Sequence, residues 1–99
     1  MGFDIEKLGQ GVNPEILELI LKETAHDIGL KVSDGASVGA KFRLNGGWGT
    51  GMSISPGKKI EGKVSEVMYW TGIGYGISSE KTRKNYFDKI REKINKLEQ

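Results

Sequence analysis

The sequence contains no cysteine, so disulfide bonds and thiolate zinc sites are excluded. This absence fits a reducing compartment, and we expect a cytoplasmic protein. His26 is the single histidine, and no motif identifies a serine that it could activate, which argues against a hydrolytic triad. The longest apolar run, residues 16–21, is too short for a bilayer and is interrupted by Glu18, so we expect no membrane partner. The first residues also lack the apolar core of a signal peptide.

Hydrophobic residues are scarce, at 36% of 99 residues, largely because the chain holds fifteen glycines. The length corresponds to one domain, residues 1–99, with a small core. Charge is distributed unevenly: residues 1–29 carry a net charge of −4 and residues 30–99 carry +6. The basic part is compatible with an anionic partner, and equally with packing of a basic helix against an acidic one.

Glycine or serine occupies every second position of two segments, residues 47–55 and 72–78. Alternate side chains of a strand point to opposite faces, so each segment would have one apolar face and one nearly bare face. Glycine weakens a strand interior, and its repetition indicates that another group approaches the backbone closely. The sequence does not identify that group: a packed helix, a partner chain or a ligand would each fit.

Two helices are predicted. Asn13 is a favourable N-cap before Pro14, and Gly29 suits the position just after the first helix. The apolar face of this helix consists of Ile16, Leu17, Ile20, Leu21, Thr24, Ala25 and Ile28. The last helix begins at Ser78 or Ser79. Its narrow apolar face consists of Phe87, Ile90, Ile94 and Leu97. Together these faces exceed what one small sheet need cover, so we expect a homodimer or a larger oligomer.

The middle of the chain predicts strands joined by a hairpin. Residues 38–44 alternate apolar and polar side chains, and Asn45-Gly46-Gly47 is a strong hairpin signal. With a three-residue loop the pairs would be Leu44–Trp48, Phe42–Thr50, Ala40–Met52 and Val38–Ile54. This register puts every large apolar group on one face, so we favour it over a two-residue loop.

Two further strand segments are expected after this hairpin. One runs from about Ile60 to Trp70, bent at Gly62, and the other from Ile73 to Ser78.

The bare strand face carries the predicted binding site. Backbone N–H groups of glycine-rich segments bind phosphate, and arginine adds paired donors. Four aromatic residues could stack on bases if exposed: Trp48, Tyr69, Trp70 and Tyr75. The candidate ligand-binding residues are Lys41, Arg43, Trp48, Gly49, Gly51, Lys58, Lys59, Gly74, Tyr75 and Gly76. An ordinary solvated strand face with its aromatic residues in the core is the alternative interpretation.

Other motifs are weaker. Gly47–Gly51 and Gly72–Gly76 lack the spacing of dinucleotide and P-loop motifs, so no cofactor is expected. Glu23-x-x-His26 resembles half of a di-iron motif without the second half, so no metal is expected. The remaining catalytic candidates, which nothing in the spacing selects, are Asp34, Glu61, Glu66 and Tyr75.

The sequence therefore predicts an α+β domain with an N-terminal helix, a four- to five-stranded, mostly antiparallel sheet and a C-terminal amphipathic helix. The favoured function is a small non-catalytic protein that binds a nucleotide or nucleic acid. A protein-interaction module, such as an inhibitor or immunity-type protein acting as a dimer, is the alternative. A small nucleotide-processing enzyme is the third interpretation.

Overall fold

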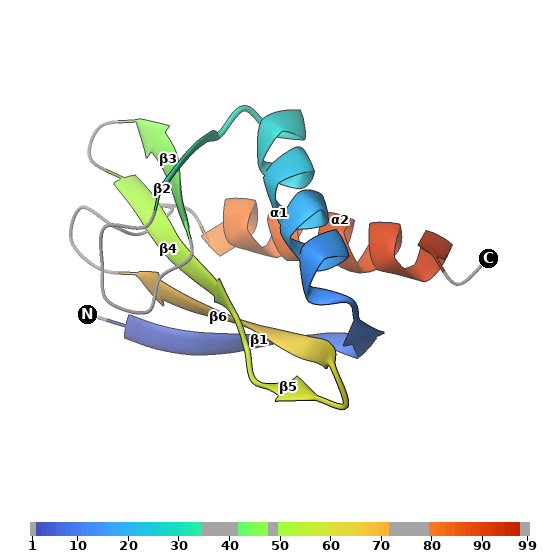
Figure 1. Cartoon of the computed structure of the whole chain (residues 1–99). Coiled ribbons are helices and arrows are strands. Elements are labelled where there is room, and N and C mark those ends of the chain that lie inside the picture. Colours follow the sequence, from blue (N-terminus) through green and yellow to red (C-terminus); the bar gives the residue numbers. More distant parts are fainter. Residues whose placement is uncertain (1, 35–41, 48–49, 72–79, 98–99) are drawn as a thin grey trace.

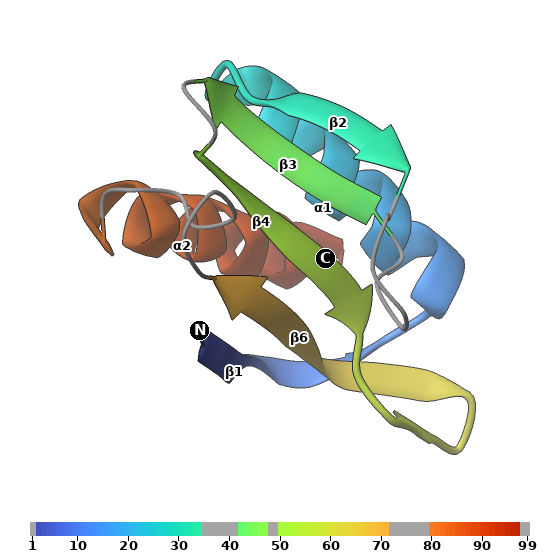
Figure 2. The same ribbon diagram turned by 90° about the vertical axis from the view of Figure 1, so that its left-hand side faces the viewer.

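The computed structural model describes residues 2–34, 42–47, 50–71 and 80–97. Two helices pack on one face of an antiparallel sheet, which is an α+β arrangement (Figure 1). In Figure 2 the strands lie in front and both helices lie behind them. The predicted fold class and the C-terminal amphipathic helix are confirmed.

The elements follow one another as β1 (Gly2–Val12), α1 (Pro14–Asp27), β2 (Lys31–Asp34), β3 (Phe42–Gly47), β4 (Thr50–Pro56), β5 (Lys59–Ile60), β6 (Lys63–Thr71) and α2 (Glu80–Leu97). The strand order across the sheet is β1-β6-β4-β3-β2, and the short β5 pairs with β6. Every described strand pair is antiparallel.

β1 is a strand that the sequence pattern does not predict. Its acidic residues Asp4 and Glu6 share a face with the buried Tyr69 and Val67 of β6, their paired positions. Ile5, on the other face, is 41% exposed. The acidic residues of β1 therefore lie on the face that the helix covers, and the apolar Ile5 lies on the opposite face. This is the reverse of the usual pattern in a strand that packs under a helix. The register also shifts between Lys7 and Val12, where Gly9 has a φ of +88°, as in a β-bulge.

Helix α1 begins and ends as predicted. The Asn13 side chain accepts hydrogen bonds from the backbone N–H groups of Glu15 and Ile16, at 2.9 and 3.2 Å. At the other end Gly29 has a φ of +81°, and the N–H of Leu30 donates to the carbonyl of Ala25 at 2.9 Å. This is a Schellman-type termination. Ser78 and Ser79, the expected start of the last helix, lie outside the described residues.

The core lies between the sheet and the two helices. Its fully buried members include Leu17 and Leu21 of α1, Ile54 and Val67 of the sheet, and Ile90 of α2. The helices also contact each other, and the buried Tyr86 hydroxyl donates to the carbonyl of Leu21 at 2.8 Å. Most of the apolar surface that motivated the predicted oligomer is thus covered within the chain. The oligomeric state itself stays a prediction.

The predicted hairpin register is wrong. The observed pairs are Phe42–Ile54, Leu44–Met52, Asn45–Gly51 and Gly47–Thr50. The strand continues through Gly46 and Gly47, so the Asn45-Gly46-Gly47 signal does not mark the connection. The shift moves the partner of each residue by an even number of positions, which leaves the same apolar residues on one face. Ala40, Val38 and Trp48, members of the other predicted pairs, lie outside the described residues.

The expected bend at Gly62 is instead a tight turn between β5 and β6. Glu61 and Gly62 have φ values of +54° and +79°, and Ile60 pairs with Lys63 across them. Two consecutive positive φ values are the signature of a two-residue type I′ hairpin. The predicted strand from Ile73 to Ser78 lies outside the described residues.

Candidate functional site

The two faces of the sheet differ in what covers them. Leu44, Ile54 and Val67 are fully buried on the face that carries the helices. The alternate positions define the opposite face, which we name the open face. It consists of positions Phe3, Ile5, Lys7, Lys31, Ser33, Arg43, Asn45, Gly51, Ser53, Ser55, Glu66, Met68 and Trp70. Wherever burial is described at these positions, the residue is partly or fully exposed.

One row of paired positions crosses five strands of the open face, and we name it the cross-strand row. It runs Phe3–Trp70–Ser53–Arg43–Ser33, from β1 through β6, β4 and β3 to β2. Directly opposed positions in an antiparallel sheet are close enough for their side chains to interact. The row therefore joins an aromatic half of the open face to a polar half.

The neighbouring rows repeat this division. Ile5, Met68 and Ser55 occupy paired positions beside the aromatic half, and Gly51, Asn45 and Lys31 occupy paired positions beside the polar half.

The open face carries more cations than anions. Lys7, Lys31 and Arg43 supply three positive charges, and Glu66, paired with Lys7, supplies one negative charge, so these positions have a net charge of +2. Glu66 lies at the β1–β6 side of the face. The positions around Arg43 and Lys31 therefore form its electropositive part.

Only part of the predicted site comes together. Arg43 and Gly51 both take positions on the open face, although Gly51 pairs with Asn45 and not with Lys41 as the predicted register implied. Lys58 and Lys59 are exposed, but Lys59 pairs with Val64. Val64 is six residues along β6 from Trp70, about 20 Å at the usual rise of a strand. The other predicted site residues lie outside the described residues: Lys41, Trp48, Gly49, Gly74, Tyr75 and Gly76.

Residues of β1 and β2 are the ones that sequence reasoning missed. Phe3, Ile5 and Lys7 reach the open face because β1 pairs with β6, and Lys31 reaches it because β2 pairs with β3. The alternation of Phe3 and Ile5 with Asp4 and Glu6 was the available signal. That alternation is compatible with a strand, but it does not predict β1, because the two acidic residues occupy the face that the helix covers.

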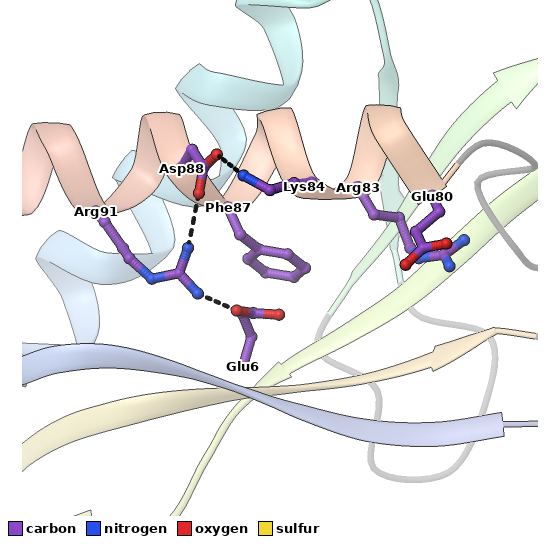
Figure 3. Close-up of a pocket in the computed structure, with 7 residues that line it drawn as sticks. All are labelled: Glu6, Glu80, Arg83, Lys84, Phe87, Asp88 and Arg91. Carbon is purple, nitrogen blue, oxygen red and sulfur yellow. Dashed lines mark hydrogen bonds and ion pairs between the residues drawn. The ribbon is translucent and has the colours of Figure 1, made fainter.

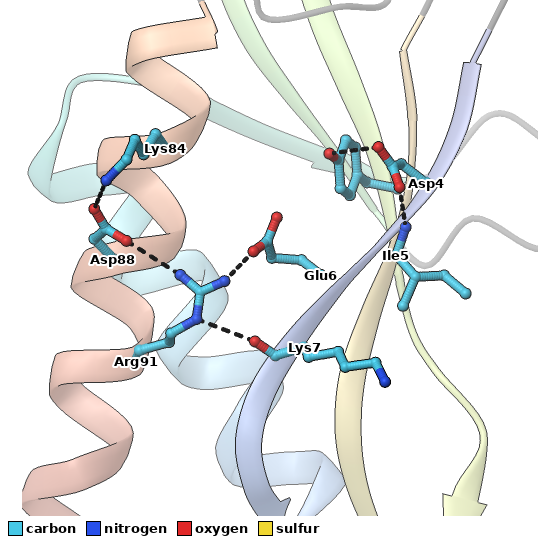
Figure 4. Close-up of polar contacts among 8 residues, drawn as sticks. Asp4, Ile5, Glu6, Lys7, Lys84, Asp88 and Arg91 are labelled. Carbon is cyan, nitrogen blue, oxygen red and sulfur yellow. Dashed lines mark hydrogen bonds and ion pairs between the residues drawn. The ribbon is translucent and has the colours of Figure 1, made fainter.

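A hollow of about 330 Å³ lies between β1 and the first half of α2 (Figure 3). Its lining residues are Glu6, Glu80, Arg83, Lys84, Phe87, Asp88 and Arg91. Arg91 spans it: the guanidinium is paired with Glu6, donates to Asp88 at 3.2 Å and donates to the carbonyl of Lys7 at 3.0 Å (Figure 4). Every nitrogen of that guanidinium is engaged, so Arg91 ties α2 to the edge strand rather than offering an anion site.

Tyr69 and Asp4 form a second polar contact under α2. The Tyr69 hydroxyl donates to the Asp4 carboxylate at 3.3 Å, and its ring lies 5.2 Å from the ring of Phe87. Burial, then the negative charges of Asp4 and Glu6, raise the pKa of Tyr69 above its ordinary value. The hydroxyl therefore keeps its proton and stays a hydrogen-bond donor at neutral pH.

The arrangement does not assemble the weaker motifs. In the described part of the chain, no group of three or more histidine, aspartate or glutamate side chains is placed to hold a metal ion. Glu23 and Asp27, which flank His26, both pair with the ammonium of Lys93, at 2.9 and 2.7 Å. The hydrogen bond from Lys93 lowers the pKa of Asp27.

The catalytic candidates are dispersed. Asp34 ends β2, Glu61 lies in the β5–β6 turn and Glu66 lies in β6, while Tyr75 is outside the described residues. Neither described helix combines the length and the apolar character needed to cross a membrane.

Comparison of the chain with family models, with curated proteins and with solved structures finds no match.

Proposed function

We propose that the protein is a small non-catalytic binding protein that holds a phosphate-bearing ligand, a nucleotide or a nucleic acid, on the open face of its sheet. The observation that carries this proposal is the cross-strand row. It aligns the positions of Arg43 and Trp70 on the face of the sheet opposite the two helices (Figure 2). A guanidinium offers paired donors to phosphate, and an indole offers a surface on which a base can stack. The cysteine-free sequence favours the cytoplasm as the place of binding.

The test compares cations on opposite sides of the molecule. Arg43→Ala removes the central cation of the open face, and Lys96→Ala removes an exposed cation of α2. The probes are ATP and mixed-sequence single strands of about 12 nucleotides. A charge-assisted hydrogen bond contributes about 1.5–3 kcal/mol, so Arg43→Ala should weaken binding by about tenfold or more. Lys96→Ala should leave it unchanged. A folded Arg43→Ala protein with wild-type affinity for every probe it binds would contradict the proposal.

A second candidate function is self-association, favoured by an exposed apolar patch where α1 begins and α2 ends. Ile16 is 42% exposed, Leu97 52% and Ile60 65%. Ile16 and Leu97 line one hollow of about 230 Å³, Ile60 lines another of about 340 Å³, and the two hollows share Gly11 and Lys63. A second copy of the chain would cover this patch and give a homodimer. Light scattering at high micromolar concentration should then show a dimer that Leu97→Ser dissociates, and a monomer of the unmodified protein would remove this candidate.

A further inference from the structure

The open face is broad, and the described hollows lie elsewhere. One lies under α2, and two lie around Gly11 and Lys63 at the far end of β6. None of the three includes a position of the cross-strand row. A free nucleotide is ordinarily held in a concave pocket that buries most of its surface. The open-face positions line none of the three hollows in the described part of the chain, and a ligand that spreads over several strands would need no such pocket.

The length of the cross-strand row points the same way. It crosses five strands, which at the usual strand separation corresponds to about 19 Å from Phe3 to Ser33. Trp70 and Arg43 are two strand spacings apart in this row, about 10 Å, so a ligand that contacts only these two positions leaves Phe3 and Ser33 at the ends uncovered. Small β domains that bind single strands cover about 4–16 nucleotides in each site.

The division of the open face matches the two parts of a single strand. Trp70 and Met68 are partly exposed and Ile5 is more so, which gives the β1–β6 side an apolar surface for unpaired bases. Lys31 and the Arg43 position lie on the β2–β3 side, where phosphates would find positive charge. In a duplex the bases are already stacked and paired, so the apolar side would have nothing to bind.

We infer that the ligand of the open face is single-stranded nucleic acid, lying across the strands with bases over the Trp70 side and phosphates over the Arg43 side. This inference rests on the proposed function and narrows it. It excludes free nucleotides and duplexes as the preferred ligands.

The experiment measures fluorescence anisotropy of labelled mixed-sequence strands of about 12 nucleotides, as DNA and as RNA. Competitors are a mononucleotide mixture and the corresponding duplex. We expect at least one single strand to bind about tenfold or more tighter than either competitor. Equal or tighter binding of mononucleotides or duplex would overturn the inference and leave the proposed function standing. Failure of every phosphate-bearing probe to bind would overturn both.

Two variants assign the binding to the open face. Trp70→Ala should weaken single-strand binding by about tenfold, while Trp70→Phe, which retains a ring, should restore most of it. The two cations of the Arg43 side, Arg43 and Lys31, predict a slope of about −1.4 for log affinity against log salt, and Lys31→Ala should reduce the size of that slope by about 0.7. The matched control Lys84→Ala, on an exposed lysine of α2, should leave the slope unchanged. If Trp70→Ala does not fold, an unchanged slope in Lys31→Ala would still overturn the inference.

Discussion

The two faces of the sheet are built from neighbouring residues of the same strands, yet they do different work. Leu44 and Ile54 are fully buried under the helices, while Arg43 and Ser53, one position away in each strand, lie on the open face. The covered face holds the molecule together through apolar burial and a few hydrogen bonds that span distant elements. The described residues of the open face are not part of that core, so substitutions there should cost less stability than substitutions on the covered face.

The sharpest test of this comparison pairs Leu44→Ala with Arg43→Ala. Leu44 is fully buried, and its truncation should cost about 2–5 kcal/mol of unfolding free energy. In a domain of this size that loss corresponds to a melting temperature lower by about 10 °C or more. Arg43→Ala should change stability by about 0.5 kcal/mol or less. Thermal unfolding measures both, and similar losses in the two variants would mean that the open face is covered.

A second test removes single hydroxyls from beneath the helices. Tyr86→Phe would remove the 2.8 Å hydrogen bond that the Leu21 carbonyl accepts in addition to its helical one, and should cost about 0.5–1.5 kcal/mol in urea unfolding. Tyr69→Phe should cost less, because its acceptor, Asp4, is exposed and can bind water. The opposite order would show that α1 and α2 are not held together by this buried contact.

A third test concerns the attachment of α2 to β1. Arg91→Lys keeps the charge but cannot reach Glu6, Asp88 and the carbonyl of Lys7 together, since it lacks the planar fork of donors. The side chain of Arg91 is 32% exposed, so solvent screening limits the expected loss to about 1 kcal/mol. Lys96→Ala serves as the control. It breaks an exposed ion pair on α2 and should lower the free energy of unfolding by only about 0.3 kcal/mol. Chemical denaturation measures both variants. Equal losses of unfolding free energy in Arg91→Lys and Lys96→Ala would show that Arg91 stabilises the protein no more than an exposed ion pair does.

The smallest effect is the pH dependence of the Lys93 contacts at the helix–helix junction. The pKa of Asp27 is lowered, first by its hydrogen bond to Lys93, so this stabilisation is present above the unfolded pKa near 3.8 and is lost as pH falls through the folded value. The pKa of Lys93 is raised above 10.5, first by its bond to Asp27, so this stabilisation is present below 10.5 and is lost as pH rises through the folded value.

Lys93→Met should therefore differ most from the unmodified protein between these limits, and the difference should shrink in acid, in strong base and at high salt. Unfolding curves across pH measure it, and a difference that is constant with pH would exclude the ion pairs as its cause.

Local signals predicted the limits of α1 well because the ends of a helix are determined by adjacent residues. The Asn13 cap and the Gly29 termination depend on contacts within a few positions. The buried members of α1 also follow from its spacing, and Leu19, which lies off that spacing, is 68% exposed. For the candidate site, Arg43 and Gly51 were predicted on a common face and are found on one, although Gly51 pairs with Asn45.

Register and β1 were beyond the reach of the sequence pattern for a physical reason. A strand repeats every two residues, so an even shift in pairing buries the same residues, and apolar alternation alone cannot distinguish Phe42–Thr50 from the observed Phe42–Ile54. The pattern does not predict β1 because Glu6, a charged residue, lies on the covered face. Its ion-pair partner, Arg91, is 85 residues later in the chain, so no local pattern indicates the pair.

The sequence by itself determined the α+β class, the limits of α1 and which residues of each predicted element are apolar, because these depend on short-range contacts and on the period of each element. Only the tertiary structure decided that both helices lie on one side of the sheet and that β1 pairs with β6. Those arrangements depend on contacts between residues far apart in the chain, whose free energy no local pattern encodes. They put the row from Phe3 to Ser33 on the face opposite both helices, and this row is the basis of the candidate site (Figure 2).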